Sequence, residues 1–297
     1  MTPAGDNLRT SSEVRIAPGS LLIGTLTAIV MLAFAANSLF ARLAFQTTTI
    51  DATSFTCIRI VSGALTLFMI VQFQGARPRY SSIEWLSAVL LFIYAAAFSF
   101  AYRNISVAAG ALVLFAAAQL LMISYGMLRG ERASIAGLLM ALGGITAFLA
   151  PSAAAPPMAS AALMAIAGFA WGGFSLLGRA SESPIAGTAS SFILAVPLAC
   201  LLLALQRNHL SWDFPGALYA LLSGTFTSAM GYAIWYWVRV RMTAISAAAV
   251  QLSVPVLSAV LGAALLHERI AVTSALSAAI TLGGIAVVTL TAKRKTS

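Results

Sequence analysis

Charged residues are scarce in this sequence. Asp, Glu, Lys and Arg make up only 8% of its 297 residues, whereas 60% are apolar. A water-soluble domain usually has about a quarter of its residues charged. The shortage excludes a water-soluble globular protein and indicates that lipid surrounds most of the surface.

Cysteines and the motifs of common enzymes are also rare or missing. The two cysteines, Cys57 and Cys200, lie inside apolar runs, so we expect neither a disulfide framework nor a metal site. No Gly-Lys-Ser/Thr phosphate loop, His-Glu-x-x-His motif or Gly-x-Ser-x-Gly motif occurs. Their absence argues against an ATP-driven pump and against an enzyme, and we expect no cofactor.

Acidic residues are missing from the interiors of the apolar runs. All eight lie in tails, loops or run ends: Asp6, Glu13, Asp51, Glu84, Glu131, Glu182, Asp213 and Glu268. Proton-coupled carriers usually contain a buried carboxylate or imidazole that titrates. The sequence therefore argues against proton coupling.

Long apolar runs fill almost the whole chain. A helix needs roughly 20 apolar residues to cross a bilayer. The runs lie near residues 19–45, 52–74, 83–103, 105–128, 134–150, 159–179, 186–206, 214–238, 243–266 and 271–292. They predict an all-α membrane protein with ten transmembrane helices.

The basic residues indicate the orientation of these helices. The net charge is +9, but the cations are scattered between apolar runs and form no basic face, so we expect no nucleic-acid partner. With an even number of helices, most cations fall on the side of the two termini: Arg9, Arg15, Arg77, Arg79, Arg129, Arg132, Arg179, Arg239, Arg241, Lys293, Arg294 and Lys295. By the positive-inside rule, we expect both termini to be cytoplasmic. The expected location is a bacterial inner membrane, with the protein crossing it many times.

An internal repeat accompanies the even helix number. A shift of 137 positions superimposes Arg42 on Arg179 and Glu131-Arg132 on Glu268-Arg269, and a slip of three more residues brings Gly143-Gly144 onto Gly283-Gly284. Each copy has five helices, an odd number, so the second copy enters the membrane inverted. We therefore expect two inverted five-helix repeats around a central cavity, with the following division: tail 1–18, first repeat 19–151, linker 152–158, second repeat 159–292 and tail 293–297.

Several short motifs carry a family resemblance. They are the stretch 170–175 (Ala-Trp-Gly-Gly-Phe-Ser) and the pairs Glu131-Arg132 and Glu268-Arg269, each of which precedes a terminal helix with Gly-Gly. With ten helices in two inverted halves, the sequence resembles the drug/metabolite transporter (DMT) superfamily, EamA-like, and within it the bacterial exporters of aromatic amino acids and paraquat. The resemblance implies a central cavity lined by helices one, three, four, six, eight and nine, with the fifth and tenth set aside.

Polar and aromatic residues inside the runs are the candidate substrate-binding residues. Asn and Gln both donate and accept hydrogen bonds, as a zwitterion requires, and aromatic rings can attract an ammonium group. The polar candidates are Asn37, Ser38, Gln119, Ser175 and Gln251, and the aromatic candidates are Tyr94, Phe98, Tyr102, Trp171, Tyr232, Trp235 and Tyr236. For Tyr102 and Tyr236 an aromatic belt at the membrane surface is an equal alternative, and Trp171 could simply fill space between helices.

Two arginines lie within the first two helices. Arg42 has the repeat mate Arg179, and this symmetric placement favours a structural anchor. Arg59 has Val196 as its mate and is the better candidate for holding an anionic substrate group. A position facing the lipid headgroups would remove Arg59 from the site.

These features favour a carrier. Inverted halves can exchange conformations and so expose a central site to each side in turn. We expect export or facilitated diffusion of amino acids, aromatic ones among them, and related small metabolites, without ATP and without proton coupling. The alternatives are an exporter of organic cations such as paraquat or of purines, and a channel-like or lipid-handling protein. The expected partners are the small-molecule substrate and the lipid bilayer; no oligomeric interface is indicated.

Overall fold

The computed structural model describes residues 20–78, 80–129, 134–149, 155–178, 184–239, 241 and 250–291. Their regular secondary structure is entirely helical. The helices are α1 (Ser20–Thr47), α2 (Ala52–Phe73), α3 (Ser82–Tyr102), α4 (Val107–Leu128), α5 (Ile135–Leu149), α6 (Met158–Gly178), α7 (Pro184–Leu205), the 3₁₀ turn η1 (Arg207–His209), α8 (Phe214–Leu222), the π-helix η2 (Ser223–Met230), α9 (Gly231–Arg239), α11 (Ser253–Leu266) and α12 (Val272–Thr291). The predicted tails, part of the predicted linker, Glu131, Arg132 and Arg179 lie outside the described residues.

The helices have the lengths and surfaces of membrane spans. Six of them are long and apolar enough to cross a bilayer, and three apolar helices are shorter: 135–149, 253–266 and 272–288. Large apolar side chains such as Leu65, Phe73, Leu139 and Leu201 are exposed on the outside of the bundle. Such a large apolar surface is unfavourable in water but favourable in lipid, so the chain is a multi-pass membrane protein. This confirms the class expected from the composition.

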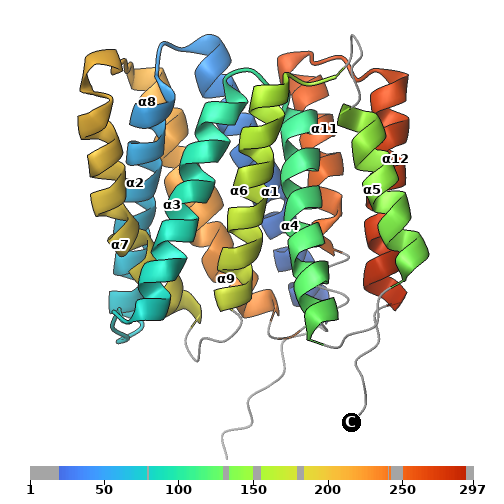
Figure 1. The fold of residues 1–297 in the computed structure, drawn as a ribbon. Helices are drawn as coiled ribbons and strands as arrows, with labels where there is room; N and C mark the ends of the chain where they lie inside the picture. Colours follow the sequence, from blue (N-terminus) through green and yellow to red (C-terminus); the bar gives the residue numbers. More distant parts are fainter. Residues whose placement is uncertain are drawn as a thin grey trace, which may run out of the picture.

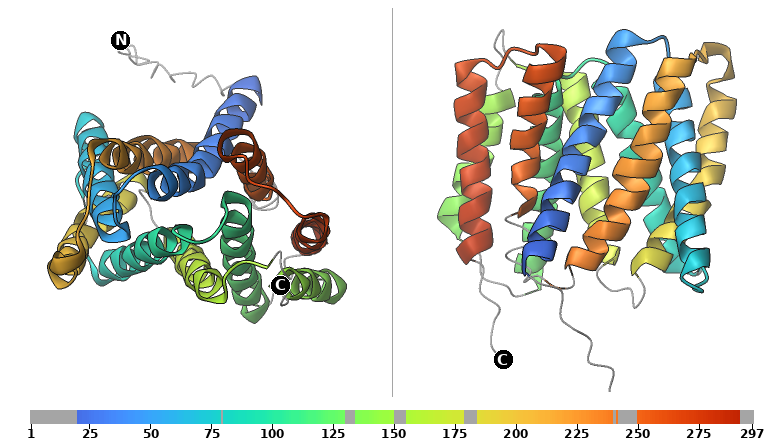
Figure 2. Two further views of the ribbon diagram at one scale, coloured as in Figure 1. Left: turned by 90° about the horizontal axis from the view of Figure 1, so that it is seen from above. Right: turned by 180° about the vertical axis from the view of Figure 1, so that it is seen from behind.

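The described spans alternate in direction through one bundle (Figure 1). If α8, η2 and α9 count as one span, the helices form ten spans, with α11 the ninth and α12 the tenth. The first turn of α1 and the last turn of α12 lie at the same end of the bundle, here called the Ser20 end (Figure 2). The opposite end, which includes the turn between α11 and α12, is called the Glu268 end.

Several helices begin at side chains that cap free backbone N–H groups. Ser81 and Glu84 form a capping box at α3, and Ser106 caps α4. Asp51 caps α2 and also accepts a hydrogen bond from the Ser211 N–H. Burial acts to raise the pKa of the Asp51 carboxyl, but hydrogen bonds from Ser54, Ser211 and Thr53 outweigh it, so this pKa lies below its ordinary value.

The eighth span differs from the single α-helix predicted near 214–238, because its middle eight residues form the π-helix η2. At Gly224 the chain packs directly on α2: a Cβ atom there would collide with Ser62 Oγ and the carbonyl oxygen of Arg59. A π-helix turns its side chains to a different register from an α-helix. The segment therefore directs Ser223, Thr227 and Ser228 to the interior, where all three are buried.

The most extensive helix contacts follow a simple rule. Three pairs join spans five places apart: the fifth with the tenth, the second with the seventh and the fourth with the ninth. The other pairs come in matching twos. The third packs on the sixth and the eighth on the first; the third packs on the seventh and the eighth on the second; the fourth packs on the sixth and the ninth on the first. If every span is replaced by the one five places away, this set of pairs is unchanged. Figure 2 shows α5 and α12 together at one side of the bundle.

Glycines bring α5 and α12 into backbone contact. A Cβ at Gly144 would lie 2.6 Å from the Thr281 nitrogen, and one at Gly284 would collide with the Ala141 nitrogen. At Gly143 a Cβ would meet nothing within 4 Å, and at Gly283 it would meet only Met140. In each Gly-Gly pair, therefore, the second glycine faces the partner helix and the first faces away.

Candidate functional site

A narrow central pocket lies among five spans. It is lined by Phe34, Asn37 and Ser38 of α1, Tyr94 and Phe98 of α3, Leu114 and Phe115 of α4, Trp171 of α6, Thr227 of η2 and Tyr232 of α9. Six of these are predicted site residues: Asn37, Ser38, Tyr94, Phe98, Trp171 and Tyr232. The spans are the first, third, fourth, sixth and eighth, which are five of the six that the family resemblance implies.

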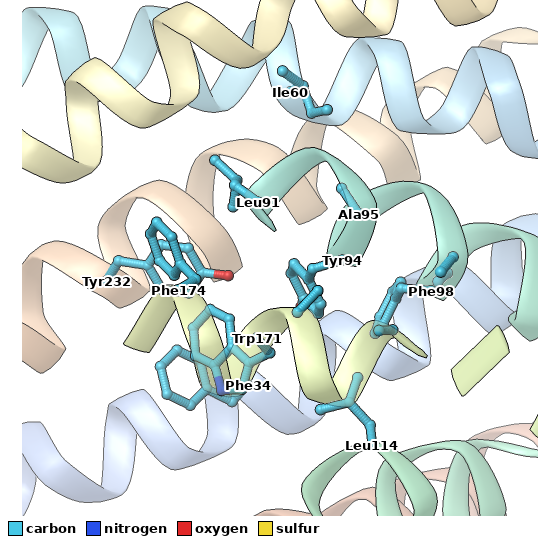
Figure 3. Packing of buried hydrophobic residues seen from close by; sticks show 14 of the residues in the cluster. Phe34, Ile60, Leu91, Tyr94, Ala95, Phe98, Leu114, Trp171, Phe174 and Tyr232 are labelled. Carbon is cyan, nitrogen blue, oxygen red and sulfur yellow. The ribbon is translucent and has the colours of Figure 1, made fainter. Parts of the chain in front are cut away.

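Trp171 stands at the centre of an aromatic cluster in this pocket (Figure 3). Its ring centroid lies 5.1 Å from that of Tyr232 and 5.2 Å from that of Tyr94. Phe34 meets it edge-on at 6.2 Å. The indole Nε1 is buried without a hydrogen-bond partner. Trp171 therefore offers both an apolar ring face and a free N–H donor.

Asn37 joins α1 to the π-helix and to α3. Its side-chain oxygen accepts hydrogen bonds from Ser223 Oγ at 2.7 Å and Thr227 Oγ1 at 3.0 Å. Its side-chain nitrogen donates to Tyr94 Oη at 3.2 Å. The amide is thus fixed in orientation on a wall of the pocket, because partners on both sides hold it.

Arg59 is buried in the same region and does not face the lipid headgroups. Only 2% of the residue is exposed. Its Nη2 donates to Tyr94 Oη at 2.9 Å, its Nε donates to Ser228 Oγ at 3.3 Å, and its guanidinium lies 4.9 Å and 4.7 Å from the ring centres of Tyr94 and Phe98. Its Nη1 is buried without a partner. Within the described part of the chain, no carboxylate forms an ion pair with Arg59; the ion pair found there joins Arg42 to Glu268.

Side chains close the pocket toward the Glu268 end. Tyr102 is fully buried, packs edge-on against Phe98 at 4.6 Å and donates a hydrogen bond from its hydroxyl to the Val107 carbonyl oxygen at 3.5 Å. Beyond it, Arg42 Nη1 donates to the carbonyl oxygens of Tyr102 and Arg103, at 3.0 and 2.9 Å.

Glu268 completes this closure from the turn between α11 and α12. Its carboxylate pairs with Arg42 Nε at 3.4 Å and accepts from the Val107 N–H at 2.8 Å. His267 adopts a left-handed backbone conformation with φ 53°, which ends α11 just before Glu268. Arg42 of α1 therefore contacts the end of α3 and, through Glu268, the turn between α11 and α12. These contacts agree with the structural role favoured by the sequence.

Two further pockets continue toward the Ser20 end. The second is lined by Trp171, Ser175, Tyr232, Trp235, Tyr236 and Arg239. The third, between the ends of α3, α6 and α7, is lined by Ile83, Glu84, Ser87, Phe174, Leu177, Gly178, Gly187, Thr188, Ser191 and Tyr236. Shared side chains connect the three, so a row of pockets runs from the central pocket toward the Ser20 end.

The remaining predicted residues have mixed positions. Tyr102 and Tyr236 are buried, which excludes the alternative of an aromatic belt facing lipid headgroups. Gln119 of α4 is buried, with a side-chain nitrogen that has no partner, but it lines none of these three pockets. Gln251 lies just before α11 and also lines none of them.

Sequence reasoning did not single out the hydroxyl residues of η2. Ser223, Thr227 and Ser228 all bond to Asn37 or Arg59. A usable signal was present: residues 223–228 read Ser-Gly-Thr-Phe-Thr-Ser, a polar cluster in the middle of an apolar run.

Three matches to known proteins bear on the family and the fold. The sequence model of the EamA-like transporter family matches residues 158–290. An uncharacterized protein of Pseudomonas aeruginosa, PA1977, is 46% identical over 266 residues, which cover 89% of this chain and 93% of that protein. A crystal structure of another protein aligns with a TM-score of 0.62 over 94% of this chain and 100% of that one; at 18% identity, this likeness shows the fold alone.

Proposed function

Because this chain belongs to the EamA-like transporter family of the DMT superfamily, we propose that it carries amino acids and related small organic metabolites across the membrane. Members of the family are transporters of small molecules, so the finer part of the proposal is the substrate. The observation that carries it is the central pocket, where hydrogen-bonding side chains and aromatic rings meet inside the bundle. Such a mixed lining suits a small solute with one charged and one apolar part.

The proposed mechanism is alternating access by two inverted repeats, residues 19–151 and 159–292. The 137-residue offset supports this division, and so does the set of helix contacts that survives exchange of the two halves. The family match over residues 158–290 spans nearly the same range as the second repeat. Two halves of this kind have two arrangements of similar energy around one site, each open to a different side.

The proposed orientation places the Ser20 end in the cytoplasm of a bacterial cell. The excess of Arg and Lys on the terminal side of the predicted spans supports it. In this orientation, the row of pockets leads from the central site toward the cytoplasm, while the contacts of Arg42 and Glu268 close the outer end.

The proposed transport is facilitated diffusion, or export, down the gradient of the substrate. The sequence has no nucleotide-binding loop, and the acids described by the structure lie at helix ends or in turns: Asp51, Glu84, Asp213 and Glu268. None of the four lines the central pocket. Proton binding at a central carboxylate therefore forms no part of the proposed cycle.

Uptake into proteoliposomes tests the proposal. The purified protein is reconstituted and offered a panel of aromatic and aliphatic amino acids, purines and organic cations such as paraquat. We expect saturable uptake of amino acids that does not rise when a proton gradient is imposed at a fixed substrate gradient. Uptake of organic cations or purines alone would overturn the substrate assignment. Unitary currents in single-channel recording would overturn the carrier mechanism in favour of a channel.

A further inference from the structure

Arg59 brings a positive charge into the centre of the bundle. Burial of a charge without a partner is costly, so buried arginines are ordinarily paired with a carboxylate or another anion. Here hydroxyl groups and aromatic rings surround the guanidinium, and one of its nitrogens is buried without a partner. Dipoles and rings stabilise the charge only in part, which leaves the region attractive to an anion.

The unpaired polar atoms of the interior point to the same ligand chemistry. Among the described residues, the buried side-chain atoms without a partner are Arg59 Nη1, Gln119 Nε2, Trp171 Nε1 and Ser258 Oγ. The first three are nitrogens that can only donate hydrogen bonds. Of these, Trp171 lines the central pocket and Arg59 reaches it through Tyr94, whereas Gln119 lies apart from it. Surplus donors at the pocket complement a ligand that is rich in acceptors, and an ionised carboxylate only accepts.

Tyr94 connects Arg59 to the pocket. Its oxygen accepts from Arg59 Nη2 at 2.9 Å and from Asn37 Nδ2 at 3.2 Å. A phenol oxygen has two acceptor positions and one hydrogen, so the hydroxyl hydrogen of Tyr94 is left to donate. Tyr94 itself lines the central pocket, so this hydrogen is available to a ligand there. Donation by a guanidinium strengthens the next donor in such a chain.

We propose that Tyr94, polarised by Arg59, forms a subsite that binds the carboxylate group of the substrate. Tyr94 contacts the substrate, and Arg59 is a positioning residue that acts through the Tyr94 hydroxyl. The inference rests on the proposed carrier function and deepens it: the substrates are small organic carboxylates, amino acids among them. Their apolar part packs beside Trp171, whose ring adjoins that of Tyr94 at 5.2 Å.

The test compares molecules that differ only at the carboxylate. Uptake and binding of an aromatic amino acid are measured beside its methyl ester, its amide and the corresponding amine without a carboxylate, in the wild type and in Tyr94→Phe. The wild type should prefer the acid over the ester. Tyr94→Phe should weaken binding of the acid by about tenfold to a hundredfold, the range for a charge-assisted hydrogen bond, and binding of the ester by only about a few fold, since an uncharged carbonyl accepts a weaker hydrogen bond.

Two further variants separate a binding role from a structural one. Tyr125→Phe makes the same chemical change on an exposed tyrosine of α4 and should leave the acid-to-ester ratio at its wild-type value. Arg59→Lys keeps the charge and should retain part of the preference, whereas Arg59→Met should abolish it. If Arg59→Met does not fold, the ratio in Tyr94→Phe decides.

The outcomes distinguish the subsite from the function. Wild-type transport of ester and acid alike, or an unchanged ratio in Tyr94→Phe, overturns the carboxylate subsite while the carrier function stands. Absence of transport for the whole panel overturns the proposed function and the subsite with it. A preference for the phosphonate analogue over the acid would also overturn the assignment, since it would identify a dianionic ligand.

Discussion

At the scale of one residue, a substitution of Trp171 tests whether the central pocket binds the substrate. It touches Phe34, Tyr94 and Tyr232 and belongs to both the central and the second pocket. We expect Trp171→Ala to reduce uptake by roughly tenfold or more, because the substrate loses its largest apolar contact. The amount of folded protein, measured by size-exclusion chromatography, should stay at its wild-type level.

Trp85→Ala is the matched control for this change, since Trp85 is exposed on α3. Trp171→Phe keeps an aromatic face and should retain part of the uptake, which guards against a general packing defect. Wild-type transport kinetics in Trp171→Ala would mean that Trp171 does not contact the substrate in the central pocket.

At the same scale, the sequence predicted some site residues better than others. Aromatic residues four positions apart share a helix face, so Tyr94 and Phe98 could be placed together from spacing alone, and both line the central pocket. Arg59 could be singled out because a cation is costly inside a span. The serines and threonines of η2 give a weaker signal, a polar cluster within an apolar run, since a hydroxyl in a helix commonly bonds its own backbone. Their contacts with Asn37 and Arg59 depend on how three helices meet.

The contact between α5 and α12 leads to a prediction at the scale of helices. Gly144→Ala should destabilise the protein by about 1–3 kcal/mol, because a Cβ there must displace the backbone of α12. Gly143→Ala, one residue away, adds the same methyl group where nothing lies within 4 Å and should be nearly neutral or slightly stabilising. Thermal unfolding in detergent compares the two variants. Equal melting temperatures would contradict the described packing of the two helices.

Element boundaries show what sequence patterns can and cannot predict. Apolar runs bounded by polar residues located the spans within a few residues, apart from the start of the ninth, where residues 242–249 lie outside the described part of the chain; burial in lipid selects for length and hydropathy. The π-helix was missed, since its register follows from the close approach of Gly224 to α2 and not from any local preference. The positive φ of His267 was likewise not predicted, as non-glycine residues seldom adopt it.

The closed Glu268 end gives a prediction for the whole molecule. Glu268 holds Arg42 and the first backbone N–H of α4, so three helices and a turn meet there. Glu268→Gln should weaken this closure and expose the central pocket more often to that side. The measurement uses Ser38→Cys in a background with Cys57→Ser and Cys200→Ser, labelled by an impermeant thiol reagent added on the Glu268 side of sealed vesicles.

We expect labelling to be about tenfold faster in Glu268→Gln, as for loss of one hydrogen-bonded charge. Arg269→Gln removes a charge from the neighbouring exposed position and serves as the control. Equal labelling rates in the two variants would mean that Glu268 does not hold this end shut. The count of cations agreed with the even number of spans that the apolar runs predicted, but it could not predict which end is closed, because that depends on the conformation adopted.

A fixed guanidinium deep in a carrier makes the cycle electrical. For a small carboxylate of net charge −1, the loaded site crosses between its two states with no net charge, whereas the empty site carries the positive charge of Arg59; a zwitterionic amino acid leaves that charge in both. Membrane potential acts on a moving charge with about 2.3 kcal/mol per 100 mV for full crossing. A cell interior that is negative would therefore draw the empty site back toward the cytoplasm. For net anionic substrates, voltage would then favour the return step and add to the concentration gradient, without ATP or protons.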